Sequence, residues 1–584
     1  MNTIILALVA AFVLLFVLLR WRLAPRPTTF GSAGWLTAWT ASSKGLFRRG
    51  GLIAGDWSGV LPVQYKGSGH ALTVSPTGGG KGTSAIVPNL LRHPWIFMLD
   101  PGGENTAIAA KAWRAKGYKF ICLNPWKMHA AAPWVLPSHA LNPLAILHPA
   151  SETFASDADL LAEMIVARTG RESGSSSYFK DEAQSSIRAF LMHIVTAEPK
   201  THRNLLTLRR YVCAQAHDWE ALLSAMKRNN AAGGLIAREA AQLERREVQA
   251  AEEFSAVLST IKQDTNFIED PVMQAALAGT GTGIDALKGY DGGARIPGCV
   301  VSVVMPLQYL ETHAAYARLI TGVALWTMMK GELSRGRVLF LLDEFAALKR
   351  MDRIQSGLAT LRKYRVWLWP IVQNLGQLKN LYGSNWQTFM SNAGFKQFMG
   401  AGDLETAEYV SKLCGVATII AVNRYNGKKT KHETRRHLAS VDEVMALRDD
   451  LQIVFADNLR PMLLRRTRYW ERPELKGTFN PNPYHSGLPA LPAWAVPARA
   501  CGFALRLAAW AVRPATPVVA AAVMAAVFTA SPGVLVSQRY PAQYQIACTY
   551  ATPTGHQRFV FRGTRWDDHC TPIYMRPMTP LWKR

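Results

Sequence analysis

The fold of this 584-residue chain is decided by one stretch, Ser75-Pro76-Thr77-Gly78-Gly79-Gly80-Lys81-Gly82-Thr83-Ser84. An apolar run at 71–74 precedes it and Ala85-Ile86-Val87 follows it, an order that predicts a short strand, a glycine turn and the start of a helix. Such a turn points backbone N–H groups at a phosphate, and the helix N-terminus adds partial positive charge. Lys81 can reach the β- and γ-phosphates. We interpret residues 75–83 as a nucleotide-phosphate loop.

The match to the general motif G-x-x-x-x-G-K-[ST] is imperfect. Ser75 stands where the first glycine belongs, and Gly82 stands where the magnesium-binding hydroxyl belongs, with Thr83 one place later. A flexible glycine-rich turn with a solvent-exposed lysine is the alternative interpretation, and the loop alone does not exclude it.

A second motif strengthens the nucleotide hypothesis. The apolar run at 338–342 has the composition of a buried strand and ends in Asp343-Glu344. P-loop ATPases bind Mg²⁺ through a carboxylate at the end of such a strand, and an adjacent glutamate can activate the attacking water. A strand followed by a helix-capping acidic pair is the alternative. Together the two motifs predict an ATP hydrolase with Mg²⁺ bound by Thr83 and Asp343, and with Glu344 as the base.

Composition limits the class of protein. The hydrophobic share is 49% and the charged share 18%, which excludes wholesale disorder. A net charge of +25 favours nucleic acid or anionic lipid as a partner, although a basic membrane protein would carry the same excess. The seven cysteines have no C-x-x-C spacing, so they do not predict a zinc site.

The N-terminus predicts a membrane anchor at 1–24. Residues 3–19 carry no charge and are followed by Arg20-Trp21-Arg22. A signal peptide is the competing interpretation, but its positive n-region is missing. The arginines after the apolar run predict that the following residues lie in the cytoplasm.

Strands that alternate with helices predict an α/β fold with a parallel-rich sheet, in two parts at 25–150 and 295–475. The expected strands are 71–74, 95–99, 119–123, 299–304, 338–342, 367–372, 395–399 and 453–456. Ligands of such sheets bind at the carboxyl ends of the strands, where the phosphate loop, Asp100 and Asp343 would lie.

Between the two parts, residues 151–294 lack strand patterns and predict an all-α insertion domain. Helical spacing is found at 157–166, 181–197 and 235–254, and the glycine-rich stretch 279–293 suits a hinge back to the sheet.

The C-terminal part is predicted to contain a Pro-rich linker at 476–512 and a second membrane span at 513–539. A buried or interfacial helix is the alternative for the span. If it crosses the membrane, residues 540–584 are a periplasmic tail in which Cys548 and Cys570 could pair.

Ordered motifs over residues 30–475 resemble the type IV secretion coupling proteins, the TraG-like ATPases of conjugation. The similar stretches are Phe30-Gly31-Ser32-Ala33, Pro76 to Gly82 with Ile86-Val87-Pro88-Asn89-Leu90-Leu91, Leu342-Asp343-Glu344-Phe345, Gln373-Asn374-Leu375-Gly376-Gln377-Leu378, and 400–415. In that family a glycine follows the lysine of the loop, so Gly82 conforms. Two features depart from it: Gly102 replaces a usual lysine in Asp100-Pro101-Gly102-Gly103-Glu104, and the family usually has two spans near the N-terminus.

The resemblance implies a RecA-like P-loop ATPase in the bacterial inner membrane, with its ATPase domain in the cytoplasm, assembled as a homo-hexamer. It would recruit relaxase-bound single-stranded DNA, effector proteins, or both, to a type IV secretion channel, contacting DNA without sequence preference. It also implies that Gln373 senses the γ-phosphate and that Arg362 is supplied in trans to the neighbouring site. From the residues alone, Gln373 could equally bind a loop, and Arg362 could equally solvate a helix end.

Two rival functions remain open at this point. An FtsK-like DNA pump would usually carry a separate winged-helix domain, and none is evident after residue 475. A non-hydrolysing membrane docking receptor would bind ATP without turnover, but Lys81, Asp343 and Glu344 are all present.

Overall fold

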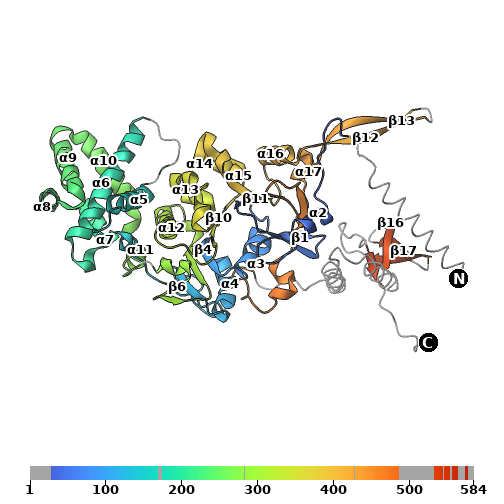
Figure 1. Cartoon of the computed structure of the whole chain (residues 1–584), viewed down its shortest axis with the longest axis horizontal. Coiled ribbons are helices and arrows are strands. Elements are labelled where there is room, and N and C mark those ends of the chain that lie inside the picture. Colours follow the sequence, from blue (N-terminus) through green and yellow to red (C-terminus); the bar gives the residue numbers. More distant parts are fainter. Residues whose placement is uncertain are drawn as a thin grey trace. The chain divides into compact units, whose positions relative to one another are not determined.

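The computed structural model describes residues 28–166, 168, 174–281, 283–425 and 428–485, together with four strands near the C-terminus. The chain divides into two compact units, 1–488 and 489–584, and each is considered by itself. The first unit carries a large sheet and an all-helical domain (Figure 1).

An 11-stranded sheet forms the centre of the first unit, in the order β2-β1-β15-β14-β11-β3-β10-β9-β4-β8-β5. All neighbours from β11 to β5 are parallel. These parallel strands are β3 (His70–Val74), β4 (Trp95–Pro101), β5 (Lys119–Leu123), β8 (Cys299–Met305), β9 (Val338–Leu342), β10 (Val366–Val372) and β11 (Ala393–Phe398). The predicted strands of the parallel sheet are therefore confirmed.

Helices cover both faces of the parallel strands, which is why β8, β9 and β10 are buried along their whole length. One face packs against α3 (Val87–Leu90) and α4 (Glu104–Ala115). The other packs against α12 (Ala314–Met329), α14 (Leu375–Tyr382) and α16 (Leu404–Cys414). The carboxyl ends of β3, β4, β9 and β10 therefore meet along one edge.

The rest of the sheet is an antiparallel wing that the sequence patterns did not predict as a whole. It consists of β1 (Leu52–Trp57), β2 (Leu61–Tyr65), β14 (Leu451–Ala456) and β15 (Met462–Arg465). Only β14 was expected. Within the wing, β1, which precedes the phosphate loop, pairs with β15, which lies near the end of the first unit.

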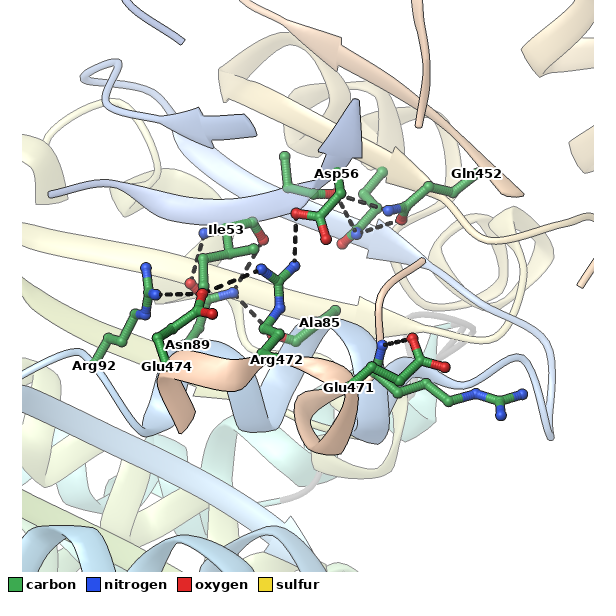
Figure 2. Close-up of polar contacts among 12 residues, drawn as sticks. Ile53, Asp56, Ala85, Asn89, Arg92, Gln452, Glu471, Arg472 and Glu474 are labelled. Atoms are coloured by element: carbon green, nitrogen blue, oxygen red, sulfur yellow. Dashed lines mark hydrogen bonds and ion pairs between the residues drawn. The ribbon is translucent and has the colours of Figure 1, made fainter. Parts of the chain in front are cut away.

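Buried polar side chains fasten this wing to the helix that follows the phosphate loop (Figure 2). Asn89 accepts from the Ile53 amide at 2.7 Å and donates to the carbonyls of Ile53 and Ala85. Arg472 pairs with Asp56 at 3.0 Å with both side chains almost wholly buried. The Asn89 bonds fix the position of the helix relative to β1, and the Arg472–Asp56 pair joins β1 to the segment after β15.

The insertion at 151–294 is helical, as expected, apart from a small hairpin of β6 (Tyr290–Asp291) and β7 (Ala294–Arg295) at its end. Its helices gather in one cluster in Figure 1: α5 (Phe154–Ile165), α6 (Ser175–Ala197), α7 (Leu205–Val212), α8 (Ala216–Lys227), α9 (Leu235–Gln249), α10 (Ala251–Asp264) and α11 (Pro271–Leu277). The expected helix at 235–254 is divided at Ala250, whose φ of −145° is not helical. One side of α9 is buried, through Ile236, Ala240 and Leu243.

A β-ribbon of β12 (Val416–Tyr425) and β13 (Lys428–His437) projects from the first unit (Figure 1). Its base pairs with the segment that begins the described chain, through a bridge between Ser32 and Ala417. No sequence pattern predicts this ribbon, because its apolar residues Ile420 and Val422 are exposed and build no core.

The predicted linker at 476–512 does not begin as a free segment. Asn480 donates to the Ala107 carbonyl and Asn482 donates to Glu104, both on α4. Tyr484 donates to the Gly102 carbonyl at 2.7 Å. Residues 476–485 therefore belong to the nucleotide domain, and residues 486–512 lie outside the described ranges.

The second unit contains a four-stranded antiparallel sheet in the order β18-β17-β16-β19. Its strands are β16 (Pro532–Ala542), β17 (Gln545–Thr552), β18 (Gly555–Arg562) and β19 (Ile573–Met575). Because β16 begins at Pro532, a membrane helix cannot continue to residue 539 as predicted. Cys548 lies on β17 opposite Phe559, and Cys570 lies outside the described residues.

Within the described ranges, no helix combines the length and the apolar character needed to cross a membrane. The predicted span at 1–24 lies outside those ranges, and so does the part of the predicted span at 513–539 that precedes β16.

Candidate nucleotide site

The phosphate loop begins where β3 ends at the edge of the sheet. Ser75 is buried, and its amide donates to the Val372 carbonyl of β10 at 2.9 Å. The loop then leaves the sheet and enters a π-helical turn at Lys81–Ile86. This strand–loop–helix order is the one that the sequence predicted.

Glycines are required in the loop for two different reasons. Gly78 and Gly80 have φ of +75° and +76°, in the left-handed region that favours glycine. A Cβ on Gly79 would lie 2.5 Å from Ser75 Oγ and 2.9 Å from the Pro76 carbonyl oxygen. The loop conformation therefore depends on all three residues.

The first turn of the helix is wide. The Val87 amide donates to the Gly82 carbonyl, five residues back. Pro88, the next residue, has no amide hydrogen and donates no helical bond. The turn at Lys81 is thereby wider than an α-helical turn.

Four side chains converge at the strand ends: Lys81, Asp343, Glu344 and Gln373. Lys81 Nζ forms an ion pair with Asp343 Oδ1 at 2.7 Å and donates to Glu344 Oε1. Gln373 Nε2 donates to Glu344 Oε2 at 3.1 Å. The residues predicted for phosphate, metal, water and γ-phosphate sensing thus form one connected cluster.

Glu344 has an unusual backbone conformation. Its φ of 58° and ψ of 49° lie in the left-handed region, which residues other than glycine seldom adopt. Such strain persists where the surrounding structure imposes it, and it is concentrated at functional sites. Here it lies at the end of β9, directly after Asp343.

The charges of the cluster depend on one another. Burial raises the pKa of the Asp343 carboxyl, and Lys81 opposes that shift. Burial lowers the pKa of Lys81, but the attraction of Asp343 and Glu344 outweighs it, so the net shift is upward. Lys81 therefore stays a cation that two carboxylates hold at the loop.

Asp100 lies at the end of β4 and is fully buried. It accepts bonds from Asn105 Nδ2 at 2.9 Å and from the Thr106 amide at 2.7 Å. Burial raises its pKa to about 6, and these two residues oppose the shift. Asp100 thus fixes the first turn of α4 beside the cluster.

Gly102, which replaces the family's usual lysine, has φ of +84°, and Gly103 has φ of +68°. Both conformations strain a residue with a side chain. The Gly102 carbonyl contacts Tyr484 Oη and His129 Nε2. Glycine here suits a turn held by two aromatic side chains.

The hydroxyl of Thr83, predicted to bind Mg²⁺, donates to the Gly80 carbonyl at 3.1 Å. Ser84 Oγ donates to the same carbonyl at 2.8 Å. Both hydroxyls therefore contact the loop itself, and the role of Thr83 as a metal ligand stays a prediction.

Arg362 does not join the cluster of its own subunit. It is exposed in the 3₁₀ turn Leu361–Tyr364, before β10, whereas Gln373 follows β10. A strand of this length separates the two by roughly 20 Å. If Arg362 acts on a nucleotide, the nucleotide belongs to another subunit.

Arg466 contacts the loop, and the sequence analysis missed it. It follows β15 and is buried, with its guanidinium donating to the carbonyls of Gly79 and Arg448. No local motif marks it, since only the pairing of β15 in the wing brings it to the loop.

The chemistry of this cluster fits a nucleotide with Mg²⁺. The loop supplies amide donors and Lys81 for phosphate oxygens. Asp343 supplies a buried carboxylate, a ligand type that Mg²⁺ prefers.

Residues 31–487 match the family model described as Type IV secretory system Conjugative DNA transfer. The chain belongs to this family.

Among its relatives, the conjugal transfer protein TraG of Agrobacterium fabrum is 27% identical over 434 residues, which cover 72% of this chain and 63% of that protein. Protein VirD4 of the same organism is 26% identical over 433 residues, covering 70% of this chain and 60% of VirD4. The chain thus spans less than two thirds of the length of these relatives.

Solved structures share the fold. The plasmid coupling protein TrwB, in complex with ADP and Mg²⁺, superposes with a TM-score of 0.56 at 16% identity. The match covers 76% of this chain and 95% of that one. This likeness, with the large parallel-rich sheet, shows a RecA-like P-loop fold.

Proposed function

We propose that this protein is an ATP hydrolase that drives the transfer of DNA through a type IV secretion channel in conjugation. One observation carries the proposal: Lys81, Asp343, Glu344 and Gln373 come from three separate strand ends and meet beside a glycine phosphate loop. Membership of the conjugative DNA transfer family supports the cargo.

Each residue of the cluster has a role in the proposed reaction. The loop amides and Lys81 hold the phosphates, so Lys81 exchanges its carboxylate partners for phosphate oxygens. Asp343, with Thr83, would hold Mg²⁺, which when bound neutralises charge on the phosphate oxygens. Glu344 orients and deprotonates the attacking water, and Gln373 holds Glu344 through its amide.

The family and the net charge of the chain support inferences about what the protein transports and how it assembles. We infer that the protein recruits relaxase-bound single-stranded DNA, effector proteins, or both. We also infer that it forms a homo-hexamer anchored in the inner membrane by residues 1–24, with its ATPase domain in the cytoplasm. The net charge of +25 supports sequence-independent contacts with DNA phosphates.

A comparison of Glu344→Gln with the unchanged protein tests the proposal. The variant should bind ATP with unchanged affinity and lose at least about 100-fold in turnover, because only the transfer of the water proton is removed. The same change at the exposed Glu152, which is remote in sequence from every motif, is the matched control and should hydrolyse ATP at the parent rate.

Single-stranded DNA should stimulate the parent enzyme, and binding should weaken steeply with salt. If the parent binds ATP but turns over no faster than Glu344→Gln with or without DNA, the protein is a docking receptor and not a motor.

A further inference from the structure

Asn105, in the first turn of α4, has an unusual side chain. It is only 5% exposed, and its Nδ2 donates to Asp100 Oδ1 at 2.9 Å. Among the described residues, its Oδ1 has no hydrogen-bond partner although that atom is buried. Buried carbonyl oxygens are nearly always paired, so an unpaired one indicates a missing ligand or a bound water.

The unpaired oxygen points at the phosphate loop. A Cβ built on Gly82 would lie 3.2 Å from Asn105 Oδ1. Gly82 occupies the position at which the general motif has the hydroxyl that contacts Mg²⁺. The carbonyl of Asn105 therefore lies next to the place of the hydroxyl that this chain lacks.

Neighbouring hydroxyls are already engaged. Thr83 Oγ1 and Ser84 Oγ both donate to the Gly80 carbonyl. Asp100 fixes the orientation of the Asn105 amide, because its carboxylate accepts from Nδ2 and so leaves Oδ1 toward Gly82. An amide carbonyl is also a ligand type that Mg²⁺ accepts, directly or through a bound water.

We propose that the side-chain carbonyl of Asn105 supplies the oxygen contact to the nucleotide's Mg²⁺, or to a water bound to it, that a hydroxyl at position 82 supplies in the general motif. Asp100 is then a positioning residue. The proposal rests on the proposed function, since it requires that the loop binds Mg²⁺ with a nucleotide.

Binding of a fluorescent ADP analogue to the full-length protein, with Mg²⁺ and in EDTA, tests the proposal. Asn105→Ala should weaken binding roughly 10–100-fold with Mg²⁺ and leave it unchanged in EDTA. Titration of Mn²⁺, followed by electron paramagnetic resonance, should show the same loss of metal affinity without any turnover.

Restoring a hydroxyl provides the second variant. Gly82→Ser in the Asn105→Ala background should recover most of the Mg²⁺-dependent affinity, because alanine vacates the space beside position 82. Equal losses with Mg²⁺ and in EDTA would overturn the proposal, since Asn105 would then only support α4. An unchanged Asn105→Ala together with a weakened Thr83→Val would overturn it in favour of Thr83.

The nucleotide-binding part of the proposed function fails if the unchanged protein does not bind the ADP analogue in either condition. The motor part fails if the unchanged protein binds ATP without turning it over. If only the role of Asn105 is wrong, the unchanged protein binds normally and hydrolyses ATP.

Discussion

Two clusters of charged side chains, one at β1 and one at the phosphate loop, differ in how far they are buried. Asp56 of β1 pairs with Arg472, which follows the wing in sequence, and the two side chains are 5% and 2% exposed and 3.0 Å apart (Figure 2). At the phosphate loop, Lys81 and Glu344 are 21% and 22% exposed, and Asp343 is 8% exposed.

The difference in exposure distinguishes a structural ion pair, Arg472–Asp56, from a functional site at Lys81. Arg472 has no access to a new partner, so its pair holds β1 against the end of the unit. Lys81 contacts two carboxylates, of which Asp343 is buried and Glu344 is 22% exposed. When Lys81 moves to a phosphate, water can reach Glu344, and Asp343 is left to a bound Mg²⁺. A closed pair therefore indicates a structural role, and a partly open cluster of mixed charge indicates function.

Removing one partner of the closed pair should give the largest effect on stability. Arg472→Met leaves the Asp56 carboxylate buried without its cation, and it should lower the free energy of unfolding by about 3–5 kcal/mol. Lys81→Met should lower it by less, roughly 1 kcal/mol, because water reaches Glu344 and because Asp343, whose pKa is raised by burial, can take up a proton. Urea denaturation followed by tryptophan fluorescence measures both.

The double variant Asp56→Leu/Arg472→Met is the control. It replaces the pair by apolar side chains of similar size and should regain most of the lost stability. Equal losses for Arg472→Met and Lys81→Met would mean that closure does not distinguish the two clusters.

His70 extends the comparison to a buried group that is neutral. Its Nδ1 accepts from the Leu368 amide at 3.1 Å and its Nε2 donates to the Leu358 carbonyl at 2.7 Å, so a second proton would break the first bond. Burial is the main cause that lowers its pKa from 6.5 to about 4. The stability that the neutral His70 ring contributes is fully present above pH 6.5. It is lost as the pH falls toward 4, and the free energy of unfolding then drops by up to about 3 kcal/mol.

His70→Asn, which keeps an acceptor for the Leu368 amide but does not titrate, should remove this acid sensitivity. Unfolding free energies at pH 7 and pH 5 measure it. An equally steep loss in the variant and the parent would mean that other groups, such as the half-buried His93, account for the acid sensitivity.

The parallel sheet and the core of the site could be predicted because each rests on a local pattern. Strands buried on both faces are continuous apolar runs, and the run that ends in Asp343-Glu344 predicts a metal-binding carboxylate beside a base. Gln373 likewise follows β10 directly, and Lys81 ends the glycine loop that follows β3. Parallel strands bring their carboxyl ends together, so these patterns sufficed to predict the cluster.

What the sequence did not predict depends on pairing between distant segments. Arg466 and Arg472 have no motif around them, and only the wing brings them to Gly79 and Asp56. The exposed ribbon β12–β13 buries no face, so apolar periodicity does not report it. Asn105 directly follows the motif stretch 100–104, but its proposed role depends on an orientation that Asp100 imposes.

The smallest expected effect is the activity regained when Arg362 of one subunit supplies a positive charge to the phosphate-loop cluster of another. Arg362 is exposed at the amino end of β10, away from Lys81 of its own subunit. If it completes a neighbour's site, Arg362→Ala and Lys81→Ala should each be inactive alone, and their mixture should regain part of the ATPase activity.

Random mixing of equal amounts leaves roughly one interface in four with an intact loop facing an intact arginine, so the regained activity should be at most about a quarter of the parent's. Lys363→Ala, which removes the adjacent exposed cation, is the matched control and should be active without mixing. Mixed rings are first verified with two different affinity tags on the subunits. If such rings stay as inactive as either single variant, Arg362 only solvates the turn before β10. Any further positive charge at the phosphate loop must then come from the same chain, where Arg466 already contacts the loop.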